Sequence, residues 1–186
     1  MWSLFDADEG KPVCNSVQKS TLEGDFIDTL GGDRCGRLKK EEIEKLSDDD
    51  PRLVTSKAVQ CNQVVYGVLS GKMKEADGTE VQLDNLPIVS YFKKSGYMPM
   101  NNFIRGLHDR KKIIPRVEVN LKTSKAKKGS VTFFVPVPTE GKSLTALSDE
   151  DKKLIRMFKD TIDAANANVL KKYNEALRGS VSEEDS

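Results

Sequence analysis

Alternating apolar and polar residues mark one long β-hairpin in the second half of the chain. Residues 116–122 and 131–137 carry valine, leucine or phenylalanine at every second position. Such period-two alternation is typical of strands that are buried on one face. The pattern predicts a hairpin over 116–137 with a basic tip at 123–129, and it places Phe134 on the polar face beside Arg116 and Glu118.

Two shorter extended segments lie upstream of this hairpin. Residues 57–70 contain the valine-rich run CNQVVYGVLS, residues 86–92 read LPIVSYF, and a turn is expected at Gly78 between them. Because β-branched and aromatic residues favour strands, the two segments are predicted to pair. Residues 1–36 are rich in Gly, Asp and Ser without clear periodicity, which predicts loops with at most one short strand.

Two segments predict short helices. Residues 38–46 have apolar residues at roughly helical spacing, and the helix is expected to end sharply before Pro51. Residues 99–110 predict a second helix whose core-facing side chains are Phe103, Ile104 and Leu107.

A long amphipathic helix is expected near the C-terminus. Ser148 is its predicted N-cap, three acidic residues fill its first turn, and Gly179 is expected to end it. Together these elements predict an α+β fold with a small antiparallel sheet (OB-like or a partial barrel), a short crossing helix and the long C-terminal helix. Three parts are expected: a loop-rich acidic segment over 1–56, a core domain over 57–178 and a disordered acidic tail over 179–186.

Charge is distributed unevenly along this nearly neutral chain. Residues 1–50 contain thirteen acidic and seven basic side chains, a net of −6, whereas residues 88–128 contain eleven basic and two acidic side chains, a net of +9. Such asymmetry is a sign of a nucleic-acid or acidic-surface partner. A solvated lysine loop is the alternative interpretation of the hairpin tip taken alone.

The basic segment also contains aromatic residues, the mixture that single-strand binders need, because lysines follow phosphates while rings stack on bases. It therefore predicts a nucleic-acid interface in which Tyr97 and Phe134 stack on bases. The complete candidate set is Lys93, Lys94, Tyr97, Arg105, Arg110, Lys111, Lys112, Arg116, Lys122, Lys125, Lys127, Lys128 and Phe134.

Catalysis is not expected. The only histidine, His108, sits at a basic helix end, and the chain has no GxxxxGK[ST], GxSxG or HExxH motif. No apolar stretch approaches the roughly 20 residues of a membrane span, and residues 1–10 lack the pattern of a signal peptide. A soluble, cytoplasmic, non-enzymatic protein is therefore predicted.

Three cysteines, Cys14, Cys35 and Cys61, leave two interpretations open. Their order resembles a zinc site with one ligand missing, because a C-x2-C pair would need a cysteine where Leu38 stands. Three ordinary buried or free thiols are the alternative. The cofactor prediction is accordingly either none or Zn2+.

The chain contains the short motifs PVCNS, GGDRCGRL and AVQCNQVVY, and they are followed by an LP-containing strand, a helix, a basic hairpin and a helix beginning LSDEDKK. In these motifs and in the order of its elements, the chain resembles phage-encoded single-stranded-DNA-binding-like proteins. The resemblance covers roughly residues 11–168. It implies a zinc ribbon, here degenerate, with Cys14, Cys35 and Cys61 on ligand positions and Asp33 or another oxygen as the fourth ligand; the loop could also keep its shape without metal.

Two functions follow as hypotheses. The first is non-enzymatic binding of single-stranded nucleic acid, most simply DNA, in phage replication or recombination, within an infected bacterial host. The second is a phage interaction factor that docks on a host polymerase or defence complex through its acidic segments or long helix. Further partners to test are replication proteins, host proteins and, in a homo-oligomer, other copies of this chain.

Overall fold

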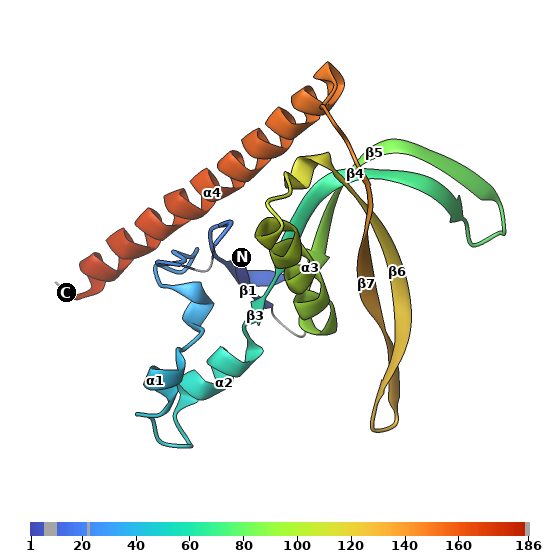
Figure 1. Cartoon of the computed structure of the whole chain (residues 1–186). Coiled ribbons are helices and arrows are strands. Elements are labelled where there is room, and N and C mark those ends of the chain that lie inside the picture. The colour runs from blue at the N-terminus through green and yellow to red at the C-terminus, as the bar shows by residue number, and fades with distance from the viewer. Residues whose placement is uncertain (6–10, 22, 185–186) are drawn as a thin grey trace. The chain divides into compact units, whose positions relative to one another are not determined.

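The computed structural model describes residues 1–5, 11–21 and 23–184 and has an α+β fold (Figure 1). The chain divides into two compact units, Met1–Asn62 with Lys159–Ser186 (unit 1), and Gln63–Phe158 (unit 2). This division differs from the predicted one, because the first boundary follows residue 62 instead of 56 and the long helix belongs to both units. Three acidic residues of the predicted acidic segment, Asp6, Asp8 and Glu9, lie outside the described residues.

Unit 1 contains a three-stranded antiparallel sheet in the order β2 (Pro12–Asn15), β1 (Trp2–Phe5), β3 (Gln60–Cys61). The expectation of at most one short strand in residues 1–36 is therefore wrong. The strands are four residues long, too short to show an alternating pattern, and they form because they pair with each other and with β3, which is distant in sequence.

The helices of unit 1 also differ from the prediction. Only Lys40–Ile43 (α1) of the expected helix 38–46 forms, and Pro51 begins a helix, α2 (Pro51–Ala58), instead of only ending one. The Asp50 carboxylate accepts a hydrogen bond from the Arg52 N–H, so Asp50 is the N-cap and Pro51 occupies the first turn, where its missing N–H costs nothing. A 3-10 helix, η1 (Arg34–Gly36), precedes both.

In unit 2, strands β4 (Gln63–Lys74) and β5 (Glu80–Phe92) form an antiparallel hairpin, which confirms the predicted pairing and the turn at Gly78. Gly78 has a φ of 93°, a conformation that glycine adopts without strain. A register shift between Leu69 and Gly71 bends the hairpin midway. β5 begins earlier than predicted, whereas β4 begins at Gln63 instead of residue 57, because residues 57–58 belong to α2, and it continues through Gly71 to Lys74.

The second hairpin of unit 2 pairs β6 (Val117–Lys128) with β7 (Val131–Ser143), and it too is longer than predicted. The strand was expected to end at Pro136 and Pro138, but β7 continues through both. Because the sheet has two strands and the prolines are two residues apart, both can turn their missing N–H to the open edge. Within the described residues the strands form three separate small sheets and no OB-like barrel.

Helix α3 (Tyr97–Asp109) follows the 3-10 helix η2 (Lys94–Gly96) and packs on β7. Leu107 is fully buried, as predicted, and Met100 is 4% exposed, although its role was not foreseen. A third 3-10 helix, η3 (Ile114–Arg116), leads into β6. These buried side chains anchor the two hairpins of unit 2.

The long helix α4 (Asp149–Glu184) begins as predicted and ends later. The Asp151 N–H donates to the Ser148 hydroxyl. The Ser148 hydroxyl and then the Ser148 N–H donate to the Asp151 carboxylate, which lowers the pKa of Asp151. The helix passes through Gly179 to Glu184, so the prediction of a disordered tail from 179 is wrong for these residues; residues 185–186 lie outside the described part. No helix among the described residues is long and apolar enough to cross a bilayer.

Candidate nucleic-acid interface

The β6–β7 hairpin has two different faces, which its register defines. Lys125 pairs with Phe134 and Lys127 pairs with Thr132, so these residues share one face, called here the Phe134 face. The other face, called here the valine face, carries Val131, Phe133, Val135 and Val137, opposite Lys128, Ala126, Ser124 and Lys122, respectively. The four lysines of residues 122–128 are therefore divided two and two.

The predicted partners of Phe134 are wrong because of the turn. The prediction assumed a seven-residue tip, but the strands meet in a two-residue turn, Gly129–Ser130, with Lys128 directly opposite Val131. Shifting a register by one residue exchanges the faces. Phe134 consequently shares its face with Leu121 and Lys125, not with Arg116 and Glu118. The lysines lie on a paired strand instead of in a loop.

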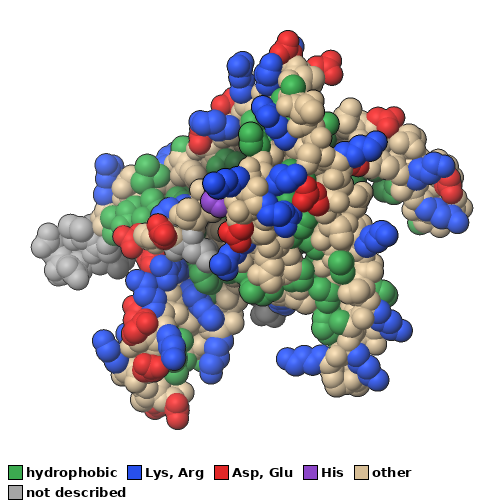
Figure 2. Space-filling model, viewed as in Figure 1, with side chains coloured by type: hydrophobic (Ala, Val, Ile, Leu, Met, Phe, Trp, Pro, Cys, Tyr) green, Lys and Arg blue, Asp and Glu red, His purple; other side chains and the backbone are tan. Residues whose placement is uncertain are grey.

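Phe134 is nevertheless exposed, as predicted, with 64% of its surface open to solvent. Cross-strand neighbours have Cβ atoms about 5 Å apart, so the Lys125 ammonium can reach a phosphate attached to a base that stacks on the Phe134 ring. In the described part of the chain, no acidic side chain forms an ion pair with Lys125 or Lys127. Figure 2 shows Lys or Arg side chains at the tip of this hairpin, among others that are spread over the visible face.

The Phe134 face continues toward the base of the hairpin, where η2 and α3 pack. A Cβ added to Gly96 would lie 3.3 Å from Cγ of Pro136, which places η2 against the same face, two residues from Phe134. Lys93 and Lys94, both exposed, lie at the beginning of this segment. The structure thus brings the segment that carries two more predicted bases close to the Phe134 face.

Glu140 marks the basal end of the same face. Its carboxylate lies 2.8 Å from a guanidinium nitrogen of Arg110 and 3.2 Å from Nζ of Lys112. The hydrogen bond from Lys112, followed by that from Arg110, lowers the pKa of Glu140. Two predicted bases therefore share one acid, and together the cluster carries a net charge of +1.

These residues form a basic strip along one face. Glu140, Pro136, Phe134 and Thr132 are separated by even numbers of residues in a regularly paired strand. At about 3.3 Å per residue, the eight residues from Glu140 to Thr132 span about 26 Å. η2 packs against Pro136 and the end of α3 lies beside Glu140, so the part of this face that is open to an extended strand runs from Phe134 to the tip.

The remaining predicted residues lie elsewhere or have other roles. Arg105, on α3, and Lys111, after it, are exposed, and Tyr97 is half-buried at the start of α3. Arg116 is half-buried, and its Nε is buried without a hydrogen-bond partner among the described residues, which makes it a poor phosphate ligand. Lys122 and Lys128 lie on the valine face.

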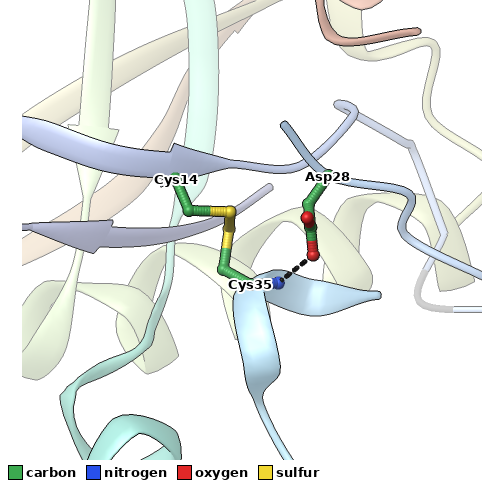
Figure 3. A group of neighbouring side chains, drawn as sticks. All are labelled: Cys14, Asp28 and Cys35. Atoms are coloured by element: carbon green, nitrogen blue, oxygen red, sulfur yellow. Dashed lines mark hydrogen bonds between the residues drawn. A yellow bond between two sulfur atoms is a disulfide. The ribbon is translucent and has the colours of Figure 1, made fainter. Parts of the chain in front are cut away.

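The predicted zinc ligands are not brought together as expected. Cys14 and Cys35 form a disulfide, and the acidic residue beside them is Asp28, not Asp33 (Figure 3). The potential ligand atoms of Cys14, Asp28 and Cys35 lie within 4.8 Å of one another, a spacing that could hold a metal. Cys61 stands outside this group, in β3, opposite Trp2.

In this oxidised form the group does not fit Zn2+. Zinc is bound by thiolates, and the two sulfurs are bonded to each other. The Asp28 carboxylate, 1% exposed, already accepts hydrogen bonds from the N–H groups of Leu30, Gly32 and Cys35, at 2.9, 3.1 and 2.7 Å. Asp28 therefore organises the loop that positions Cys35.

Sequence reasoning missed Asp28, although a signal was present. An aspartate followed by Gly31 and Gly32 is typical of a loop in which the carboxylate accepts backbone N–H groups. Asp33, the predicted oxygen ligand, instead accepts a hydrogen bond from the Phe26 N–H at 2.6 Å.

Comparisons of the chain with models of protein families, with curated proteins and with solved structures found no match.

Proposed function

We propose that this protein binds single-stranded nucleic acid on the Phe134 face of the β6–β7 hairpin. The observation that carries the proposal is the direct pairing of Lys125 with Phe134, a ring that is 64% exposed. A paired strand holds both residues in place, so little ordering is required on binding. Lys127, Lys93 and Lys94 extend the contact along the phosphates.

The geometry favours a single strand over a duplex. A ring exposed on a two-stranded ribbon can stack only on a base that is not already stacked between neighbours. Lys125 and Lys127 are two residues apart on one face, about 6.6 Å along the strand, which suits successive phosphates of an extended strand. In this proposal the residues of the Phe134 face bind the strand and carry out no chemical step.

The resemblance to phage-encoded single-stranded-DNA-binding-like proteins supports a role in phage replication or recombination. It extends over residues 11–168 and includes the basic hairpin. The proposal accordingly names DNA as the first ligand to test, with RNA of the same sequence beside it.

The test is a fluorescence-anisotropy titration with a labelled oligonucleotide at several salt concentrations. Lys125→Ala with Lys127→Ala should weaken binding and reduce the salt slope by about 1.4, because each phosphate contact to a single strand contributes about 0.7. The matched control is Lys122→Ala with Lys128→Ala, which removes the same charge from the valine face. Equal losses from both pairs would show non-specific charge attraction and contradict the proposed face.

Stacking is tested separately at Phe134. Phe134→Ala should cost about 1 to 3 kcal/mol of binding free energy, with the salt slope unchanged, and Phe134→Trp should retain binding. Leu121→Ala is the control, because Leu121 is 53% exposed on the same face but has no ring. Unchanged affinity of Phe134→Ala would remove base stacking from the proposal.

A further inference from the structure

Unit 2 exposes apolar side chains on both hairpins. On β4–β5, Leu69 pairs with Leu86 and Met73 pairs with Val81, and the first three of these are 42%, 46% and 44% exposed, respectively. On the valine face of β6–β7, Val131 is 62% exposed and Val137 is 39% exposed. Two-stranded hairpins are marginal by themselves, and clustered exposed apolar residues mark interaction sites.

The two hairpins carry opposite charge where these apolar residues lie. The end of β4–β5, residues 72–84, has four acidic and two basic side chains, and one of the bases, Lys72, is paired with Glu80. Residues 119–139 of β6–β7 have four lysines and no acidic residue. On the valine face, Lys128 stands opposite Val131 and Lys122 opposite Val137, so a lysine flanks each end of the apolar row.

The complementary surfaces belong to the same unit but lie apart. In Figure 1 the turn of β4–β5 and the turn of β6–β7 are at separate ends of unit 2. One chain therefore cannot join its own two tips, whereas two chains can. A contact between two different surfaces is heterologous and leaves a free copy of each surface for another molecule.

We propose that the end of β4–β5 docks on the valine face of β6–β7 of a second copy of this chain. Leu69, Leu86 and Met73 pack against the valine row, while Glu75 and Asp77 of the turn meet Lys128 or Lys122. The Phe134 face stays open in this arrangement. The association does not depend on nucleic-acid binding, so either proposal can fail without the other.

Sedimentation velocity of the full chain without nucleic acid, over a wide range of protein concentration, tests the association. The average mass should rise above that of one chain with concentration, and more so at low salt, because the charged contacts are screened by salt. Leu86→Asn and Val131→Asn should each weaken self-association about tenfold. A protein that stays a single chain at every concentration and salt overturns the proposal.

Mixing the two variants tests the head-to-tail geometry. Leu86→Asn keeps an intact valine face and Val131→Asn keeps an intact β4–β5 end, so an equimolar mixture should form pairs of chains and nothing larger. If the mixture associates no better than each variant alone, the contact is not heterologous and the proposal is wrong.

Charge exchange provides a test that leaves the apolar residues in place. Glu75→Lys with Asp77→Lys should abolish the low-salt enhancement, Lys122→Glu with Lys128→Glu should do the same, and the chain carrying all four changes should recover it. Lys125→Ala with Lys127→Ala is the control, because these lysines lie on the Phe134 face. Loss of association in that control, with retention in the Lys122 and Lys128 variant, would overturn the assignment of the face.

Discussion

The N-terminal part of unit 1 and the two hairpins of unit 2 reach order by opposite routes. The former has short strands and irregular loops, yet it buries polar residues almost completely, including Ser3, Ser16 and Asp28 at 0%, 1% and 1% exposure. The latter have long regular strands, yet much of their apolar surface is exposed. Regular pairing therefore does not by itself indicate a core.

Specific side-chain hydrogen bonds explain the order of unit 1. The backbone N–H of Trp2 donates to the Ser16 hydroxyl, and the Asn62 side-chain amide donates to the Ser3 hydroxyl. Buried polar groups that are satisfied in this way define one arrangement, whereas each unsatisfied one is costly. The disulfide packs with Trp2, Leu4 and Val59, and the Cys35 N–H joins it to the buried Asp28 carboxylate.

The largest change in stability is expected at Leu107, because unit 2 has few buried apolar side chains. Leu107→Ala removes a fully buried side chain from α3 and should lower the free energy of unfolding by about 2 to 5 kcal/mol. Leu121→Ala, at a position 53% exposed on β6, should change it by no more than about 0.5 kcal/mol. Urea unfolding followed by circular dichroism measures both, and similar values for the two would contradict the contrast.

In unit 1 the disulfide between Cys14 and Cys35 is the link whose removal should destabilise the fold. Cys14→Ala with Cys35→Ala releases a link over 21 residues and should cost about 3 kcal/mol, because the unfolded chain regains conformational entropy. Trp2, the only tryptophan, lies beside this site, so its fluorescence during urea unfolding reports the change.

Reductant provides the control for this link. Reductant should destabilise the native chain but not the double alanine variant. Cys61→Ala should lower the free energy of unfolding less than the double alanine variant does, because Cys61 is not in a disulfide. A native chain whose stability is independent of reductant would contradict the prediction.

A smaller effect is expected at Ser56, which belongs to the polar network of unit 1. Its hydroxyl accepts the Leu38 N–H at 3.1 Å, and the residue is 2% exposed. Ser56→Ala leaves that N–H without its partner and should cost about 1 to 2 kcal/mol. Thr55→Ala, at the adjacent exposed position, is the control. Thermal unfolding of both variants measures the difference, and equal midpoints would show that the hydrogen bond contributes nothing.

The smallest effect concerns Glu140 in unit 2. Its pKa is lowered in the folded chain by Lys112 and Arg110, so its contribution to stability is present above the unfolded pKa and is lost as the pH falls through the lowered value. Glu140→Gln should therefore lower the unfolding midpoint slightly at neutral pH, and the difference from the native chain should disappear in acid. A difference that is independent of pH would show that charge is not its cause.

Several features of this protein follow from its sequence because they depend on neighbouring residues. The alternation in 116–122 and 131–137 is sufficient for a hairpin, and the Ser148 cap with its acidic first turn is sufficient for the start of α4. The exposure of Phe134 and the burial of Leu107 were also predictable from local periodicity. In each case the physical cause is contained within a few residues along the chain.

Other features depend on contacts between distant residues, which only the tertiary structure reveals. Cys14 and Cys35 become partners because β1, β2 and the Asp28 loop bring them together, and no spacing rule selects that pair over Cys61. The choice of which lysines accompany Phe134 depends on a two-residue turn, since one residue more or less would exchange the faces. The sequence therefore indicated only a cluster of charge, and the pairing across the hairpin determines which of these lysines share a face with Phe134.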